Sequence, residues 1–137
     1  MFGKPSRQGS KIPGRSAKTG KLFVREEAGQ ALKDWRANVR ECAIAARDGQ
    51  DMMTGALRLT VVFFVPRPKS VSVSSRPLPT VAPDLDKMVR AVGDALKEAA
   101  VYKDDSQIIE IIAAKHYATE KADHAPGAWI KVGPYLS

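Results

Sequence analysis

Cysteine is almost absent from this sequence, and it contains no long apolar segment. Among the 137 residues the single cysteine is Cys42, which excludes an internal disulfide framework and a zinc cluster held by thiolates. The longest apolar run, residues 59–65, is broken by Thr60 and is far shorter than the ~20 residues of a membrane span. The opening residues, Met-Phe-Gly-Lys, lack the apolar stretch of a secretory signal. We therefore expect one soluble domain in a reducing compartment.

Acidic residues are missing from the first 25 positions. This segment holds seven of the 22 basic residues and none of the 15 acids, so the rest of the chain carries 15 charges of each sign. Gly, Ser and Pro separate the basic residues, which is typical of an extended arm that neutralises a polyanion, most often nucleic acid. The alternative is a solvated basic tail without a specific partner.

Apolar spacing predicts two helices, over residues 26–47 and 84–100. In both segments apolar residues recur at intervals of three and four, which places them on one helical face. Trp35 and Cys42 lie on that face of the first helix, and we interpret both as core residues, with an inert thiol. Asp84 stands where a residue that caps the second helix is expected.

Strands are predicted over residues 57–65, 107–114 and 128–132. The first alternates with a β period, and we expect it to be covered on both sides at its end. Residues 107–114 include four isoleucines, which is typical of a strand buried on both faces. A further short strand is predicted near residues 21–24. The simplest packing is an α+β fold with two helices on one face of a small mixed sheet.

Residues 66–83 form a long predicted loop with five prolines, four serines, three basic residues and no acid. A loop of this length in a small domain is usually functional or disordered. We interpret it as a second flexible, basic element. Together with the arm it is expected to contact nucleic-acid phosphates, and so is Lys87 just after the loop. The residues assigned to this role are Lys4, Arg7, Lys11, Arg15, Lys18, Lys21, Arg67, Lys69, Arg76 and Lys87.

Acidic residues gather around the second helix, at Asp84, Asp86, Asp104 and Asp105. If residues 84–86 stay extended, Asp84 and Asp86 project to the same side. Asp105 joins them if the strand that follows it starts beside the start of this helix. Three carboxylates without nearby Cys or His suit Mg²⁺, with Mn²⁺ as a substitute, rather than zinc. Such ions support phosphodiester hydrolysis.

The same residues also have an ordinary structural interpretation. Asp84 is then a helix cap, and the later Asp-Asp pair is part of a turn. Arg90 lies one helical turn after Asp86, so it either pairs with that carboxylate or steers the scissile phosphate. We interpret His116 and His124 as structural or surface residues. The pattern by itself leaves both interpretations open.

Residues 83–108 resemble the signature of the RusA family of Holliday-junction resolvases, which are common in phages and prophages. The resemblance lies in Pro-Asp-Leu-Asp at 83–86, Asp-Ala-Leu at 94–96 and Asp-Asp-Ser-Gln-Ile at 104–108. The strand that ends in Pro-Arg-Pro at 66–68 also looks like the family, as does a basic region that leads into a helix containing Trp35.

This resemblance implies a homodimeric α+β nuclease that resolves four-way DNA junctions by Mg²⁺-dependent paired nicking. Such an enzyme serves DNA recombination and repair, here in the cytoplasm of a bacterial host. Asp84, Asp86 and Asp105 match the acids that bind metal in the family, and Arg90 matches the position of its functional lysine. Lys87 stands where the family has Asn, which adds a positive charge beside the site. Arg90 keeps the charge of Lys but not its geometry.

Three other functions fit the residues. A non-catalytic nucleic-acid-binding protein would use the basic segments alone, with the aspartates as caps and turns. A metal-dependent phosphoesterase could act on small nucleotides, with the arm as a tail. An assembly module could bind an acidic partner through the arm.

Overall fold

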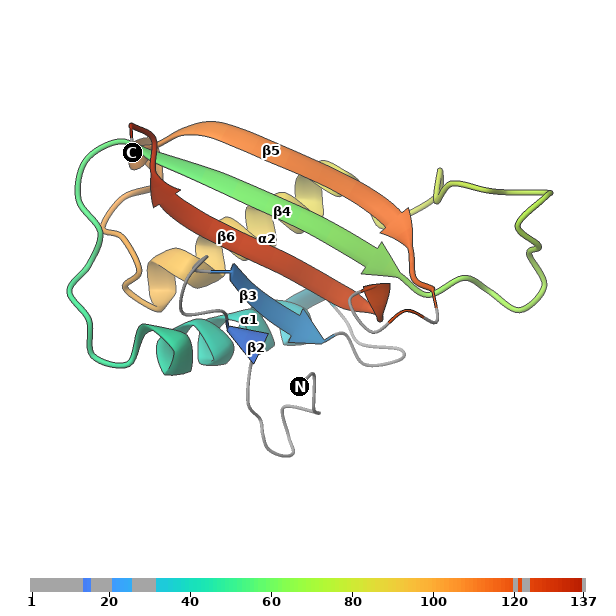
Figure 1. Ribbon diagram of the computed structural model, residues 1–137, viewed down its shortest axis with the longest axis horizontal. Helices are drawn as coiled ribbons and strands as arrows, with labels where there is room; N and C mark the ends of the chain where they lie inside the picture. Colours follow the sequence, from blue (N-terminus) through green and yellow to red (C-terminus); the bar gives the residue numbers. More distant parts are fainter. Residues whose placement is uncertain (1–13, 16–20, 26–31, 120, 122–123, 137) are drawn as a thin grey trace.

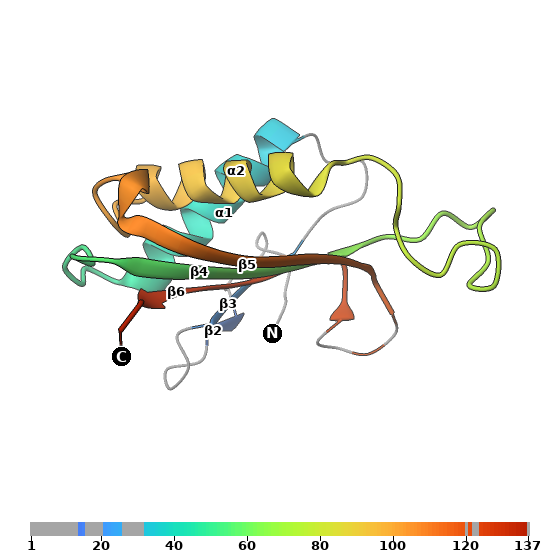
Figure 2. The ribbon, with the colours of Figure 1, turned by 90° about the horizontal axis from the view of Figure 1, so that it is seen from above.

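The computed structural model describes residues 14–15, 21–25, 32–119, 121 and 124–136. These residues form a five-stranded mixed sheet with two helices on one face (Figures 1 and 2). The strand order is β2-β3-β6-β4-β5, with β4 and β5 parallel and the other pairs antiparallel. The elements are β2 (Gly14–Arg15), β3 (Lys21–Arg25), α1 (Leu32–Arg47), β4 (Leu57–Val65), α2 (Leu85–Glu98), the 3₁₀ turn η1 (Asp105–Gln107), β5 (Ile108–Tyr117) and β6 (Gly127–Pro134). The predicted α+β architecture is therefore confirmed.

The core lies between the helices and the sheet. Every second residue of β4 points toward the helices, and Leu57, Leu59, Val61 and Phe63 are at most 2% exposed. The Trp35 ring of α1 lies 6.5 Å from the Phe63 ring. Trp35 is thus a core anchor, as its place on the apolar face of the helix predicts. Cys42 is buried too.

The predicted elements correspond closely to the observed ones. Strand β4 spans the predicted residues, and its last three residues are all buried. The short predicted strand near residues 21–24 is β3, which pairs with β6. Within the described residues the first helix begins at Leu32, and the predicted start at residues 26–31 lies outside them. Helix α2 ends at Glu98, close to the expected end.

The prediction for the isoleucine-rich strand is wrong in one respect. Strand β5 forms, but it is not buried on both faces: Ile109, Ile111 and Ile112 are 57%, 52% and 51% exposed. The reason is its place at the edge of the sheet, beside β4 alone. An apolar run predicts a strand, but it does not predict whether that strand lies inside the sheet or at its edge.

Candidate active site

Two of the predicted carboxylates lie at the start of α2. Asp84 occupies the N-cap position with an extended backbone (φ −71°, ψ 139°), yet its side chain makes no capping hydrogen bond. Asp86 lies in the first turn, and both side chains are exposed. Lys87 Nζ approaches Asp84 Oδ2 at 4.0 Å, a loose ion pair in solvent. The interpretation of Asp84 as a side-chain cap therefore fails, and its carboxylate oxygens remain accessible to a cation.

The extended geometry considered for residues 84–86 does not occur. Helix α2 begins at Leu85, so only Asp84 keeps an extended backbone. In a helix, positions two apart point in different directions. The two carboxylates are therefore neighbours at one helix end and are not the aligned pair of a strand.

The chain just before this pair is fixed to the sheet by Lys115 of β5. Lys115 Nζ donates to the backbone carbonyls of Val81 and Pro83, both at 2.8 Å. Sequence analysis missed this residue. Its signal was a lone lysine in an apolar strand, at a position paired with the buried Phe63.

The third predicted ligand, Asp105, lies elsewhere. Because α2 connects two parallel strands, it runs antiparallel to β5, and β5 starts beside the end of the helix (Figure 1). The expectation that β5 starts beside the start of α2 is therefore wrong. Asp105 lies near the Tyr102 hydroxyl, which donates to the carbonyl of Gly93 at 2.9 Å. Burial raises the pKa of this hydroxyl, and the charges of Asp105 and Asp94 raise it further.

Asp104 has a structural role in the fold. Its side chain accepts a hydrogen bond from the Ser106 amide at 3.0 Å, and the Gln107 side chain accepts from the Asp104 amide at 3.0 Å. This is a capping box, and it begins η1. The hydrogen bond from Ser106 lowers the pKa of Asp104. For this residue the interpretation as a turn holds.

Arg90 lies one turn after Asp86 on α2 and is exposed. Across the residues that the structure describes, no ion pair joins these two side chains. The structural interpretation of Arg90 as the i,i+4 partner of Asp86 therefore has no support in the fold. Its guanidinium remains available to an anionic ligand.

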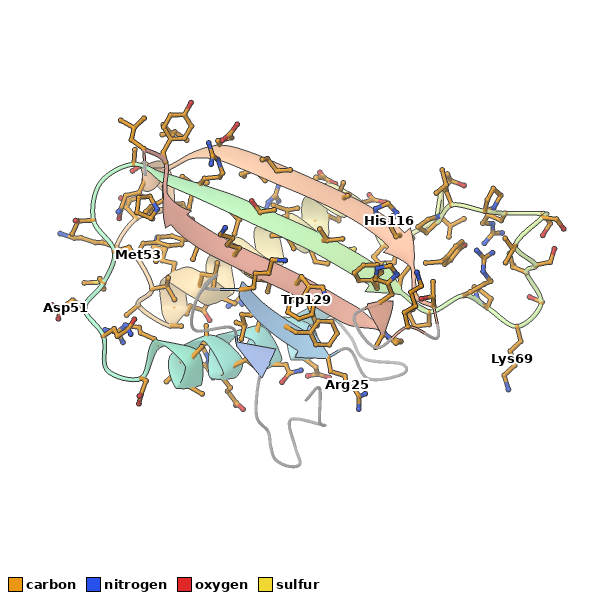
Figure 3. The ribbon with its side chains drawn as sticks, viewed as in Figure 1. Arg25, Asp51, Met53, Lys69, His116 and Trp129 are labelled. Carbon is orange, nitrogen blue, oxygen red and sulfur yellow. The ribbon has the colours of Figure 1, made fainter. Side chains whose placement is uncertain are left out.

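The basic residues of the 66–83 loop play different parts. Arg67 stacks 4.0 Å over the Tyr117 ring and donates to the carbonyls of Ser72 and Arg76, at 3.0 and 2.5 Å. Arg76 in turn donates to the Tyr117 hydroxyl at 3.3 Å. Lys69 points outward from the loop (Figure 3). The loop is therefore anchored to β5 at its base, while Lys69 projects into solvent.

The arm is only partly described. Lys21 belongs to β3, and its Nζ lies 5.7 Å from the centre of the Trp129 ring. Arg15 lies in β2. The remaining predicted arm contacts lie outside the described residues, and they are Lys4, Arg7, Lys11 and Lys18.

Two of the three predicted metal ligands lie where they could bind a hard cation. Asp84 and Asp86 offer carboxylate oxygens at an exposed helix end, and Mg²⁺ is commonly held by one or two carboxylates with water and substrate phosphate. In the described part of the chain no three Asp, Glu, His or Cys side chains gather closely enough to hold a metal ion. Nor is any helix there long and apolar enough to cross a membrane.

Comparison with known proteins decides the family. The family model for endodeoxyribonuclease RusA matches residues 9–130. The chain belongs to the RusA family. It is therefore an endodeoxyribonuclease that resolves Holliday junctions, and its substrate is branched DNA. RusA-family nucleases depend in general on a divalent metal.

A bacterial protein is similar to this chain over most of its length. Uncharacterized protein YqaN of Bacillus subtilis (strain 168) is 33% identical over 129 residues, which cover 88% of this chain and 87% of the relative. An alignment that covers this share of the chain spans residues 84–105, which hold the aspartates of α2 and η1. The RusA membership also confirms the family resemblance on which the sequence-based prediction of junction cleavage rests.

Proposed function

We propose that this RusA-family nuclease acts as a homodimer that uses Mg²⁺, held by Asp84 and Asp86 at the start of α2. In this proposal Asp105 of the partner subunit completes each site. The observation that carries it is the exposed Asp84 carboxylate, which stands at a helix start without capping the helix. A carboxylate in that state is available as a ligand.

The proposed metal matches the chemistry of the donors. Oxygen ligands from carboxylates favour Mg²⁺ and disfavour zinc, which prefers nitrogen and sulfur. When bound, the ion would activate water and neutralise charge on the phosphate. Asp84 and Asp86 would hold it, and the exposed Arg90 would orient the scissile phosphate and stabilise its developing charge.

The homodimer is supported by the free edge of β5. This edge strand has ten residues and exposes three isoleucines, more apolar surface than an edge strand in solvent normally shows. Two copies paired antiparallel along β5 would bury these side chains around a two-fold axis. The same axis would bring the start of one β5 beside the end of the other.

That arrangement would also bring together carboxylates that lie apart in one chain. Asp105 precedes the start of β5, whereas the segment before Asp84 is bound to Lys115 near the end of β5. Antiparallel pairing would place Asp105 of the partner subunit near Asp84 and Asp86. Two such sites related by a two-fold axis match the two symmetric cuts that junction resolution requires.

The DNA would be held mainly by its phosphates. Lys69 is exposed on the 66–83 loop, Lys87 and Arg90 are exposed on α2, and the basic arm adds further charge. Each phosphate contact adds about 0.9 to the slope of log affinity against log salt. Recognition would then depend on the shape of the junction more than on its sequence.

The test is cleavage of a labelled four-way junction, with a linear duplex beside it and with Mg²⁺ present or removed by chelation. Asp86→Asn should abolish symmetric nicking while leaving junction binding in place. Asp51→Asn is the matched control, since Asp51 is an exposed aspartate in the loop between α1 and β4, away from α2's start (Figure 3). Full cleavage by Asp86→Asn would refute the assigned site.

A further inference from the structure

We infer that Lys115 is a positioning residue for cleavage, because it fixes the chain from which the Asp84 and Asp86 carboxylates project. This inference rests on the proposed metal site and adds a residue that the family motif does not include. Lys115 comes from β5, about 30 positions along the sequence from the carboxylates, and the fold brings it to them.

The contacts of Lys115 are specific. Its Nζ donates to the carbonyls of Val81 and Pro83, and both distances are 2.8 Å. Hydrogen bonds from a charged donor are roughly twice as strong as neutral ones. Pro83 is the residue before Asp84, so one of these bonds is made to the peptide group that leads directly into the carboxylate pair.

The position of Lys115 in the strand indicates that its ammonium group depends on these two hydrogen bonds. It pairs with the buried Phe63 of β4 and lies on the face of the sheet that packs against the helices. Lysine is disfavoured at such a position unless its ammonium group has partners. The two carbonyls supply those partners, and the side chain is only partly exposed.

The next residue on the same face anchors the other end of the loop. Tyr117 stacks under the Arg67 guanidinium at 4.0 Å, and its hydroxyl accepts from Arg76 at 3.3 Å. The end of β5 therefore holds the loop at two places, with Tyr117 at its base and Lys115 beside α2. Of these two anchors, Lys115 is the one adjacent to the carboxylates.

Small displacements at such a site have large effects on rate. A shift of about 1 Å in a group that positions the reacting atoms can cost on the order of 100-fold in rate. Loss of the two Lys115 bonds would free the carbonyls of Val81 and Pro83 and loosen the segment that leads into Asp84. Junction binding, which depends on phosphate contacts spread over the surface, would change little.

The test separates rate from binding in the full-length protein. Lys115→Met keeps the length of the side chain and removes the ammonium group. We expect its kcat with saturating Mg²⁺ and junction to fall about tenfold or more, while the junction Kd measured in Ca²⁺ stays within about twofold of wild type. Lys121→Met is the charge-matched control, since Lys121 is exposed in the loop after β5.

Chemical rescue tests whether the ammonium group itself is required. A Lys115→Cys variant in a Cys42→Ala background is alkylated with bromoethylamine, which restores an ammonium group at nearly the original reach. We expect kcat to recover on alkylation. If Lys115→Met does not fold, Lys115→Arg replaces it, because it keeps the charge but alters the geometry, and the same loss of kcat is expected.

The outcomes are distinct. A wild-type kcat for Lys115→Met, or for Lys115→Arg in its place, would overturn the inference. So would a weakened Kd with unchanged kcat, since Lys115 would then be a DNA contact. Cleavage that survives Asp86→Asn refutes the metal site itself, whereas loss of cleavage in Asp86→Asn with full activity in Lys115→Met refutes the positioning role alone.

Discussion

Two inactive variants should restore nicking when they are combined in one dimer. The variants are Asp86→Asn and Asp105→Asn, each of which should abolish cleavage as a homodimer. If the site is shared between subunits, their heterodimer has one site with both substitutions and one site with none. The intact site should nick one strand of each junction.

The length of α2 is the physical reason to expect a site shared between two subunits. Asp105 lies near Tyr102, whose hydroxyl bonds to the Gly93 carbonyl, and Gly93 is about two helical turns beyond Asp86, a rise of about 10 Å. Ligands of one Mg²⁺ lie about 2.1 Å from the ion, so their oxygens must come within about 4 Å of one another. The two carboxylates of one chain do not meet this condition, whereas those of two chains can.

The assay uses differently tagged subunits, co-expressed and purified through both tags. A supercoiled plasmid with an extruded cruciform is the substrate, because one nick gives an open circle and paired nicks give a linear product. We expect the heterodimer to form open circles at about half the wild-type rate per dimer, since one of two sites is intact. A heterodimer as inactive as the parent homodimers would refute the shared site.

Further perturbations test the interface, the core and the turn. Ile112→Glu places like charges opposite each other near the middle of the proposed β5 pairing. The protein should become monomeric in sedimentation and lose cleavage. A persistent dimer would exclude the β5 edge as the dimer interface. Leu96→Ala removes a 2%-exposed core side chain and should lower the free energy of unfolding in urea by about 3 kcal/mol; a loss below about 1 kcal/mol would contradict the packing. Asp104→Ala removes a carboxylate whose pKa is lowered in the folded state by the Ser106 amide. That stabilisation is present above the ordinary aspartate pKa of about 3.9 and is lost as pH falls through the lower folded value. The variant should therefore melt below wild type at pH 7 and equal to it in strong acid, and equal melting at both would contradict the cap.

The sequence alone determined the local elements of this protein. Helical spacing identified α2, and β alternation identified all of β4. Burial on one face makes apolar residues recur along the sequence with the period of the element. The excess of positive charge and the aspartate motif also lie in the sequence. The charge indicated a nucleic-acid partner, and the motif carried the resemblance to the RusA family that implied a nuclease of branched DNA, which the family match confirms.

Only the tertiary structure decided how the candidate site is arranged. Asp84 makes no side-chain cap to its helix, whereas Asp104 caps a turn. The difference depends on backbone geometry and on hydrogen bonds that the same residue type can make or omit. The remoteness of Asp105 follows from the parallel pairing of β4 and β5, and the role of Lys115 follows from the contact of β5 with residues 81–83. These are contacts between distant parts of the chain, and no local period encodes them. The exposed β5 edge has the same origin, since an apolar run specifies a strand without specifying its place in the sheet.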